Sequence, residues 1–182
     1  MRSDNIIKLN EYYSTMKEVF LITVNKGKLL AAQKAFSKYG IQVKQINKEY
    51  LEIQAKSSLE IARFTVLEAI KEFKVPVIRE DHSLFIHSLN GFPGPYTNYF
   101  DKTMPVEILI KILSLFKDRS AHMELAAALA LPNGKIYDFV YQVPLKISEN
   151  IKGDKGNWDK VLMLPDDTHT FSESKEDGRL DI

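Results

Sequence analysis

The chain has 182 residues with 25 basic and 24 acidic side chains, and its net charge of +1 provides no overall field to attract a nucleic acid polymer or an anionic membrane. It contains no cysteine, which excludes disulfides, thiolate metal sites and cysteine nucleophiles and fits a reducing, cytoplasmic environment. Hydrophobic residues make up 45% of the chain, enough for a sizeable core, yet no apolar run approaches the roughly 20 residues that span a bilayer.

The beginning of the chain predicts a strand followed by a helix. Residues 1–16 are polar and aperiodic, and we expect an N-terminal appendage there, ahead of a single domain over residues 17–175. The apolar run 19–24 predicts a buried strand. Apolar residues spaced three and four apart then predict a helix over 26–39, with Tyr39 on its buried face.

Three further elements come before the middle of the chain. Alternating apolar and polar residues predict a half-exposed strand over 41–46. A helix that begins after Ser57 or Ser58 as its N-terminal cap is predicted to reach Phe73. The run Val75-Pro76-Val77-Ile78 predicts a short strand, and its proline favours the first residues of a strand or an edge strand.

The second half predicts one helix and three strands, at residues 105–116, 122–131, 136–143 and 161–164. The turn sequence Pro132-Asn133-Gly134-Lys135 predicts a hairpin between the two longer strands. The last dozen residues, including a polar tail at 176–182, are expected to be loose. Strands interleaved with helices, together with one hairpin, indicate an α/β fold with a mixed sheet.

A first candidate for chemistry is the turn Thr23-Val24-Asn25-Lys26-Gly27-Lys28, where the first strand passes into the first helix. Such a turn presents free backbone N–H groups and the positive end of the helix dipole, and both suit a phosphate. The two lysines add positive charge. A solvated basic helix start is the alternative interpretation of this turn taken alone.

A second candidate is the polar sequence Arg79-Glu80-Asp81-His82, which we expect to form a turn at the end of the 75–78 strand. Paired carboxylates at this end of a sheet can hold Mg²⁺ and can orient or deprotonate a water molecule. A polar turn without a ligand is the alternative. Glu52 is a third acidic candidate, and its alternative is an exposed strand residue.

A third candidate is the loop Gly156-Asn157-Trp158-Asp159, which contains the one tryptophan of the chain. We expect Trp158 to stack on a base while the Asp159 carboxylate accepts a hydrogen bond from a purine N–H. An aromatic side chain packed beneath a loop is the alternative.

Taken in chain order, these segments resemble the inosine triphosphate pyrophosphatase family. Four motifs match its pattern: the Thr-x-Asn-x-x-Lys turn at 23–28, Glu52-Ile53-Gln54, the acidic segment Glu80-Asp81, and Pro93-Gly94-Pro95-Tyr96. The last of these is similar to the eukaryotic and archaeal branch. The resemblance covers about residues 19–173 and implies an elongated two-lobed α/β fold, with a mixed sheet and flanking helices, a nucleotide between the lobes, and a homodimer.

The resemblance also implies an activity, the hydrolysis of ITP, dITP or XTP to the nucleoside monophosphate and pyrophosphate. Carried over by position, the residues that bind the triphosphate are Thr23, Asn25 and Lys28. The Mg²⁺ ligands are Glu52 and Asp81; Asp81 is expected also to position or activate the attacking water, and Glu80 to support it. Trp158 and Asp159 match the aromatic-Asp pair that recognises the base.

The sequence departs from the family pattern around the base. Gly156 stands where the family has a stacking phenylalanine, and the family's closing Ser-His-Arg is absent after Glu173. A catalytically decayed, nucleotide-binding homologue is therefore an alternative, and a pyrophosphatase for a modified or pyrimidine nucleotide is a third. The phosphate and metal positions survive together, and this favours the enzyme.

Overall fold

The computed structural model describes residues 16–51 and 53–177, so the expected appendage up to residue 15, Glu52 and the end of the polar tail lie outside the described residues. Seven strands form one sheet in the order β2-β1-β3-β5-β6-β7, with β4 beside β3. Their bounds are β1 Glu18–Ile22, β2 Gln42–Ile46, β3 Val77–Ile86, β4 Pro93–Gly94, β5 Ser120–Ala130, β6 Ile136–Ile147 and β7 Leu162–Met163. β1 runs parallel to β2 and β3, and the remaining pairs are antiparallel, which confirms the predicted mixed sheet.

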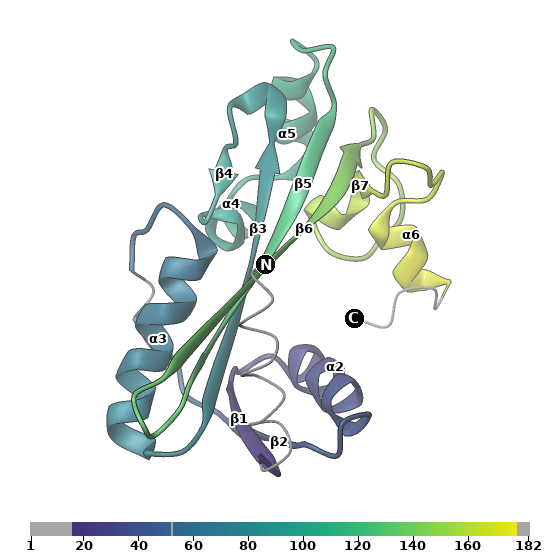
Figure 1. The fold of residues 1–182 in the computed structure, drawn as a ribbon. Helices are drawn as coiled ribbons and strands as arrows, with labels where there is room; N and C mark the ends of the chain where they lie inside the picture. Colours follow the sequence, from purple (N-terminus) through teal and green to yellow (C-terminus); the bar gives the residue numbers. More distant parts are fainter. Residues whose placement is uncertain (1–15, 52, 178–182) are drawn as a thin grey trace.

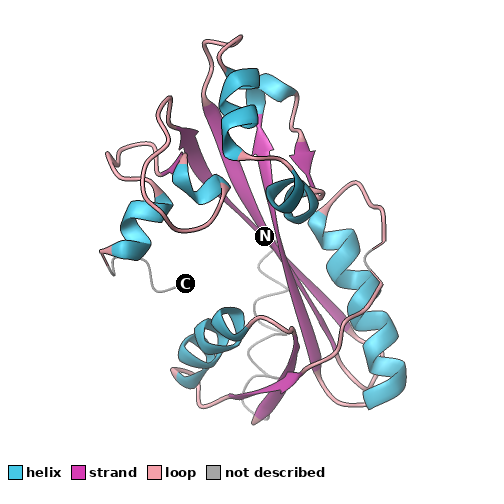
Figure 2. Ribbon diagram, turned by 180° about the vertical axis from the view of Figure 1, so that it is seen from behind, coloured by secondary structure: helices cyan, strands magenta, loops and turns pink. Residues whose placement is uncertain are grey.

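The long strands β3, β5 and β6 cross the whole molecule and join two lobes (Figure 1). The first lobe contains β1, β2, α2 (Lys26–Ser37) and α3 (Ser58–Phe73). The second contains α4 (Thr97–Thr103), α5 (Val106–Leu113), α6 (Phe171–Glu176) and the short strands β4 and β7. Seen from behind, α3 lies along the opposite side of the long strands from α2 and α6 (Figure 2). The elongated two-lobed arrangement is therefore confirmed.

The core of the first lobe has two layers, because successive side chains of a strand point to opposite faces. Val19 and Leu21 of β1 lie in the cluster beneath α2, whereas Ile22 lies in the cluster against α3. Ala128 and Ala130 of β5 join the α3 cluster. Their small side chains let the helix approach the sheet closely.

The core of the second lobe forms where α5 packs on the far ends of β3, β5 and β6. The three fully buried residues of α5, Val106, Leu109 and Leu113, are spaced three and four apart, as the sequence predicts. Pro105 precedes the first turn as its N-terminal cap. Among the described residues, no helix has the length and apolar character that crossing a membrane requires.

The first helix differs from the sequence prediction at its C-terminal end. α2 stops at Ser37, and Tyr39 is 78% exposed rather than buried. The helix covers the edge of the sheet from one side, so Leu29, Ala32 and Phe36 are only partly buried against it. Gly40 then adopts a φ of +69°, a conformation that favours glycine and turns the chain into β2.

Two expectations about polar segments are wrong. The sequence Arg79-Glu80-Asp81-His82 is not a turn but the middle of the ten-residue strand β3. An unbroken antiparallel ladder with β5, from Val77 opposite Ala130 to Ile86 opposite Ala121, holds these polar residues in the strand. The C-terminal segment is not loose up to residue 177, because α6 forms there.

Candidate active site

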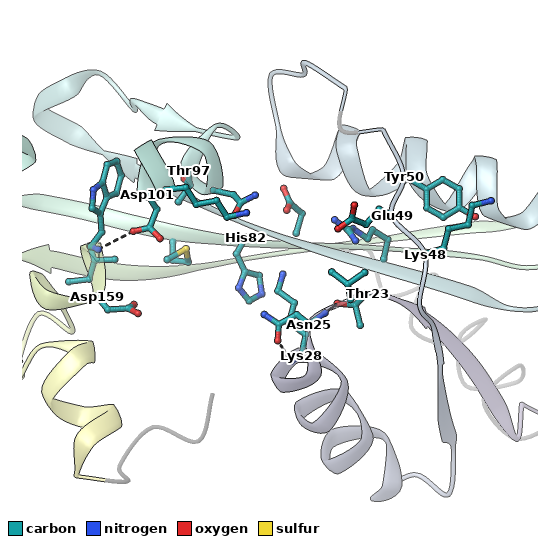
Figure 3. A pocket seen from close by; sticks show the side chains of 18 residues that line it. Thr23, Asn25, Lys28, Lys48, Glu49, Tyr50, His82, Thr97, Asp101 and Asp159 are labelled. Carbon is teal, nitrogen blue, oxygen red and sulfur yellow. Dashed lines mark hydrogen bonds between the residues drawn. The ribbon is translucent and has the colours of Figure 1, made fainter. Parts of the chain in front are cut away.

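A cavity of about 590 Å³ lies between the two lobes (Figure 3). Its wall includes five of the predicted site residues, Thr23, Asn25, Lys28, Asp81 and Asp159, and an edge of a sixth, Trp158. His82 lies between Asp159 on one side and Asn25 and Lys28 on the other. Segments that are more than 130 residues apart in the chain thus meet around one space.

The position of this cavity results from how β3 is paired. β1 pairs with β3 only as far as Ile78, and β4 pairs with it only from Leu84. Within the described part of the chain, residues 79–83 therefore have no strand neighbour on that edge. Side chains that point to both faces of an uncovered edge can reach the same space, and so the neighbours Asp81 and His82 both line the cavity.

The turn after β1 is held by its own side chains. The Thr23 hydroxyl, which is buried, accepts a hydrogen bond from the Asn25 N–H at 3.1 Å. The Asn25 side-chain oxygen accepts from the N–H groups of Gly27 at 2.8 Å and Lys28 at 3.2 Å, which makes Asn25 the N-terminal cap of α2. The Asn25 amide nitrogen has two further donors to offer a phosphate.

Lys28 is held in the cavity wall by an acidic partner. Its ammonium group forms an ion pair with one oxygen of Glu80, and the other oxygen of that carboxylate contacts Nε2 of His82. Burial opposes ionisation of Glu80, but the hydrogen bond to His82 and the charge of Lys28 outweigh it and lower the pKa of Glu80 to about 2. Glu80 is therefore an ionised carboxylate between Lys28 and His82 at neutral pH and not a proton acceptor.

Asp81 faces the other side of β3, because adjacent residues of a strand alternate. Two residues along on the same face, Ser83 is buried and its hydroxyl contacts that of Ser58 at the start of α3. Asp81 itself is half-buried in the cavity wall. A carboxylate in this position can orient a water molecule or coordinate a cation.

The acidic residues of the cavity fit Mg²⁺ by their chemistry. Among the described residues there is no cluster of three or more acidic or histidine side chains that would enclose a metal. Mg²⁺, however, is usually bound by one or two carboxylates together with substrate phosphates. Asp81 provides one such carboxylate, and the cavity wall extends to Glu49 and Tyr50, close in sequence to Glu52.

Trp158 was expected either to stack on a base or to pack beneath the loop, and in the structure it is packed. It is 1% exposed and belongs to the core of the second lobe. Its indole N–H donates to the Met104 carbonyl at 3.0 Å, and its backbone N–H donates to the Asp101 carboxylate at 3.0 Å. With 1% of its surface exposed, Trp158 offers little ring surface on which a base could stack.

Asp159 lies at the same end of the cavity, and its carboxylate points into the space between the lobes. Lys175 of α6 donates to its Oδ2 atom at 2.6 Å. The sequence analysis does not identify Lys175, because it predicts a loose segment there. The pattern Thr170-x-x-Glu173 is a signal that could have predicted the helix, since both hydrogen bonds of a capping box are formed.

The second lobe contributes a helix that sequence reasoning also missed. α4 places four side chains in the cavity wall: Thr97, Asn98, Asp101 and Lys102. The helix has seven residues and none is fully buried, so it leaves no apolar periodicity in the sequence. The Pro-Gly-Pro-Tyr sequence before it marks a turn but does not indicate a helix after that turn.

Comparisons with known proteins agree with this architecture. The model of the Ham1 family matches residues 19–182. A dITP/XTP pyrophosphatase from Ignicoccus hospitalis is 39% identical over 163 residues, covering 88% of this chain and 87% of that protein, and one from Methanopyrus kandleri is 32% identical over 157 residues, covering 86% and 84%. The structure of the Staphylococcus aureus Ham1 protein superposes with a TM-score of 0.74 at 23% identity, covering 90% and 91% of the two chains.

Proposed function

Because the chain belongs to the Ham1 family, we propose that it hydrolyses non-standard purine nucleoside triphosphates such as ITP, dITP and XTP to the nucleoside monophosphate and pyrophosphate. The relatives named dITP/XTP pyrophosphatases support this activity. The observation that supports it most is the cavity itself, whose wall contains Asn25 and Lys28, the carboxylate of Asp81 and a second acidic residue, Asp159.

Each of these residues has a physical task in the reaction. Negative charge develops on the departing pyrophosphate, and fixed donors that already point at it lower the barrier. Lys28 supplies a positive charge whose position is set by Glu80. Asn25 supplies amide donors from a side chain that the helix cap holds in place. Asp81 accepts a hydrogen bond from the attacking water and so orients it toward the phosphorus.

The reaction is proposed to require Mg²⁺, with Asp81 and Glu52 as the residues that would hold it. Bound Mg²⁺ would neutralise charge on the phosphate oxygens. Removing divalent cations with a chelator is expected to abolish hydrolysis, and adding Mg²⁺ back is expected to restore it. Turnover that persists unchanged in the chelator would contradict this part of the proposal.

The family resemblance further suggests a homodimer and a cytoplasmic location. Sedimentation of the purified protein tests the first, and a mass of about two chains is expected. A monomer over the whole concentration range would rule out the dimer, but it would not contradict the proposed reaction.

The activity is tested with a panel of standard and non-standard triphosphates, with the products separated. Pyrophosphate and monophosphate are expected from ITP, dITP and XTP, and much less from ATP and pyrimidine nucleotides. Release of orthophosphate and a diphosphate, or no turnover on any member of the panel, would contradict the proposal.

A second candidate, a nucleotide-binding homologue without catalysis, is favoured by the altered base end of the cavity, where Trp158 is enclosed and Asp159 is paired with Lys175. It predicts that a triphosphate raises the melting temperature without being cleaved. Hydrolysis that Asp81→Asn abolishes would exclude it.

A further inference from the structure

His82 lies in the middle of the cavity wall, on the part of β3 that no strand of the described chain covers on one edge. Its side chain is 35% exposed and points into the space between the lobes. Lys28 lies on one side of it and Asp159 on the other (Figure 3). A ligand that reaches from Lys28 to Asp159 would therefore pass His82.

The two ring nitrogens of His82 have different surroundings. Nε2 is buried and contacts Oε2 of Glu80, whose other oxygen pairs with Lys28. An ionised carboxylate only accepts hydrogen bonds, so Nε2 carries a proton whether the ring is neutral or charged. The contact with Glu80 thus fixes both the orientation of the ring and the nitrogen that faces away from the carboxylate.

Nδ1 is the nitrogen that remains for a ligand. It has no hydrogen-bond partner among residues 16–51 and 53–177, although its side chain lines the cavity. On a neutral ring Nδ1 is an acceptor, and on a charged ring it is a donor. A hydroxyl group can pair with it in either state, because a hydroxyl both donates and accepts, whereas an ionised phosphate only accepts.

A nucleotide has hydroxyl groups at the corresponding place. Its sugar joins the base to the phosphates and so lies between them. Under the proposed function the phosphates bind at Asn25 and Lys28 and the base lies toward Asp159, which brings the sugar beside His82. ITP and dITP, both proposed substrates, share the 3′-hydroxyl and differ at the 2′ position, so the 3′-hydroxyl is the group that both can offer.

We propose that His82 binds the sugar of the substrate, with Nδ1 hydrogen-bonded to the 3′-hydroxyl while Nε2 stays on Glu80. The proposal rests on the proposed function, since it concerns the sugar of the same substrate. A nucleotide without this hydroxyl leaves Nδ1 covered by the bound ligand and without a partner. The loss of one hydrogen bond of this kind corresponds to a fall of about three- to tenfold in kcat/KM.

The test compares ITP, dITP and 3′-deoxy-ITP as substrates. In the unaltered protein, kcat/KM for 3′-deoxy-ITP is expected to be about three- to tenfold lower than for ITP, with dITP close to ITP. Equal values for ITP and 3′-deoxy-ITP would overturn the proposal, as would a deficit for dITP in place of 3′-deoxy-ITP. This part of the test needs no variant and so does not depend on the folding of one.

Two variants separate the roles of the two nitrogens. His82→Gln puts an amide near the position of Nε2 and retains a donor for Glu80, whereas His82→Asn puts an amide near the position of Nδ1. The ratio of kcat/KM for ITP to that for 3′-deoxy-ITP is expected to fall to about one in His82→Gln and to be partly retained in His82→Asn. A ratio that His82→Gln leaves unchanged would overturn the proposal.

His87→Gln is the matched control. It makes the same change at an exposed histidine outside the cavity wall, directly after the end of β3, where the ring bonds to Ser120 and His122. The ratio is expected to stay at its original value in this variant. If His87→Gln lowers the ratio as much as His82→Gln does, the proposal is wrong.

Other roles for His82 give a different pattern. A side chain that only holds Glu80, or one that binds a phosphate, would affect ITP, dITP and 3′-deoxy-ITP by the same factor. Their ratios would then be the same in His82→Gln as in the unaltered protein, which is the outcome that overturns a contact with the sugar.

The failure of this proposal can be told from failure of the proposed function. If the protein hydrolyses ITP and Asp81→Asn abolishes that turnover, equal kcat/KM for ITP and 3′-deoxy-ITP overturns the role of His82 alone. If no triphosphate is cleaved, the proposed function has failed, and calorimetric binding of ITP and 3′-deoxy-ITP decides about His82. Weaker binding of 3′-deoxy-ITP is expected there, and equal affinities, or no binding of either nucleotide, would overturn the proposal.

Discussion

Glu80 and Asp81 are neighbours in sequence with the same type of side chain, and the strand gives them different surroundings. Glu80 contacts Lys28 and His82, and these contacts lower its pKa to about 2. Asp81 points to the other face of β3, into the cavity wall. The first residue sets the position of a positive charge, and the second lines the space in which a water molecule and a cation would bind.

Replacing Glu80 by Gln is expected to affect substrate binding more than stability. Without the carboxylate, the Lys28 ammonium loses the group that fixes it, so KM for ITP is expected to rise several-fold. Because the two side chains are 29% and 25% exposed, solvent screening limits the stability loss to about 1 kcal/mol. Steady-state kinetics and urea unfolding measure the two effects. Glu68→Gln, which breaks the exposed pair with Lys71 on α3, is the matched control; an equal change of KM in that control would contradict the role of Glu80.

Gly156→Ala is expected to be more harmful than the same change at Gly134. Both glycines have a positive φ, +69° and +84°, and share the backbone cost of about 1 kcal/mol that a side chain there brings. A Cβ at Gly134 meets nothing within 4 Å, whereas at Gly156 it lies 2.3 Å from the Asp159 carboxylate. Urea unfolding measures the stability of both variants, and the additional loss in Gly156→Ala is the cost of this contact. Equal losses in the two variants would contradict the prediction, because they would show that the loop can move to accommodate the Cβ atom.

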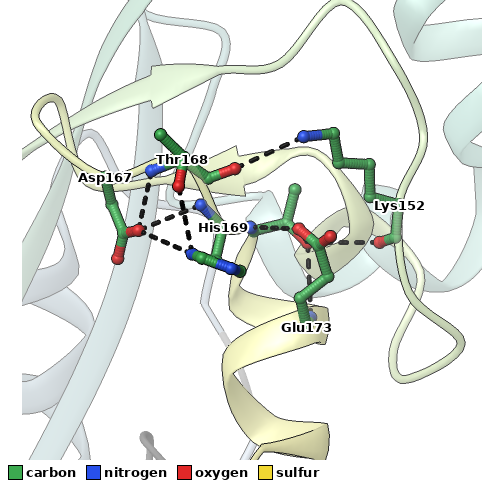
Figure 4. A network of polar contacts seen from close by, with 6 residues as sticks. Lys152, Asp167, Thr168, His169 and Glu173 are labelled. Atoms are coloured by element: carbon green, nitrogen blue, oxygen red, sulfur yellow. Dashed lines mark hydrogen bonds and ion pairs between the residues drawn. The ribbon is translucent and has the colours of Figure 1, made fainter.

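At the scale of elements, α6 supplies the lysine that pairs with Asp159 of the cavity wall, although the helix has only six residues. Its start lies in a network in which the Asp167 carboxylate accepts from the N–H groups of Thr168 and His169, and Lys152 donates to the Thr168 carbonyl (Figure 4). These contacts hold the chain ahead of the helix. The capping box then sets the direction in which Lys175 leaves it.

The capping box makes the stability of α6 dependent on pH. The Thr170 N–H donates to the Glu173 carboxylate and lowers the pKa of Glu173 below its usual range, against a smaller opposing effect of burial. The stabilisation is therefore complete above the ordinary glutamate pKa of about 4.3 and is lost as the pH falls through the lowered value of the folded state. The difference in melting temperature between the unaltered protein and Glu173→Gln is expected to be largest near pH 7 and to shrink in acid. Glu149→Gln, at an exposed position, is expected to show no such trend, and a difference that grows in acid would contradict the assignment.

Most elements could be predicted from the sequence because their periodicity reflects one-sided burial. α3 and α5 show this clearly, as does the hairpin turn at Asn133 and Gly134 between β5 and β6. The C-terminal end of β3 could not be predicted from the sequence, because the polar middle of this strand faces a cavity rather than the core. Pairing with β5, which is distant in sequence, holds it in the strand. α4 and α6 are too short and too exposed to leave an apolar pattern.

At the scale of the whole molecule, the cavity exists because three long strands connect the lobes while β1 ends beside Ile78 and leaves the next part of β3 uncovered. The presence of Asn25 and Lys28 in the wall of this cavity could be predicted from a motif whose residues are close in sequence. The pairing of Asp159 with Lys175 could not, because Lys175 reaches Asp159 only through the packing of α6 on the loop that precedes Asp159. Trp158 was a candidate because of its aromatic ring, but it is buried in the core of the second lobe, and its burial also depends on residues far away in the sequence.

The central claim is that Asp81 acts on a polyphosphate held by Asn25 and Lys28 in one cavity, and its most direct test is pyrophosphate release from ITP by Asp81→Asn. Asp166→Asn, at an exposed loop position, is the control. We expect Asp81→Asn to retain the melting temperature and to reduce kcat at least about 100-fold, with Asp166→Asn unchanged. Undiminished release of pyrophosphate by a folded Asp81→Asn would contradict the account.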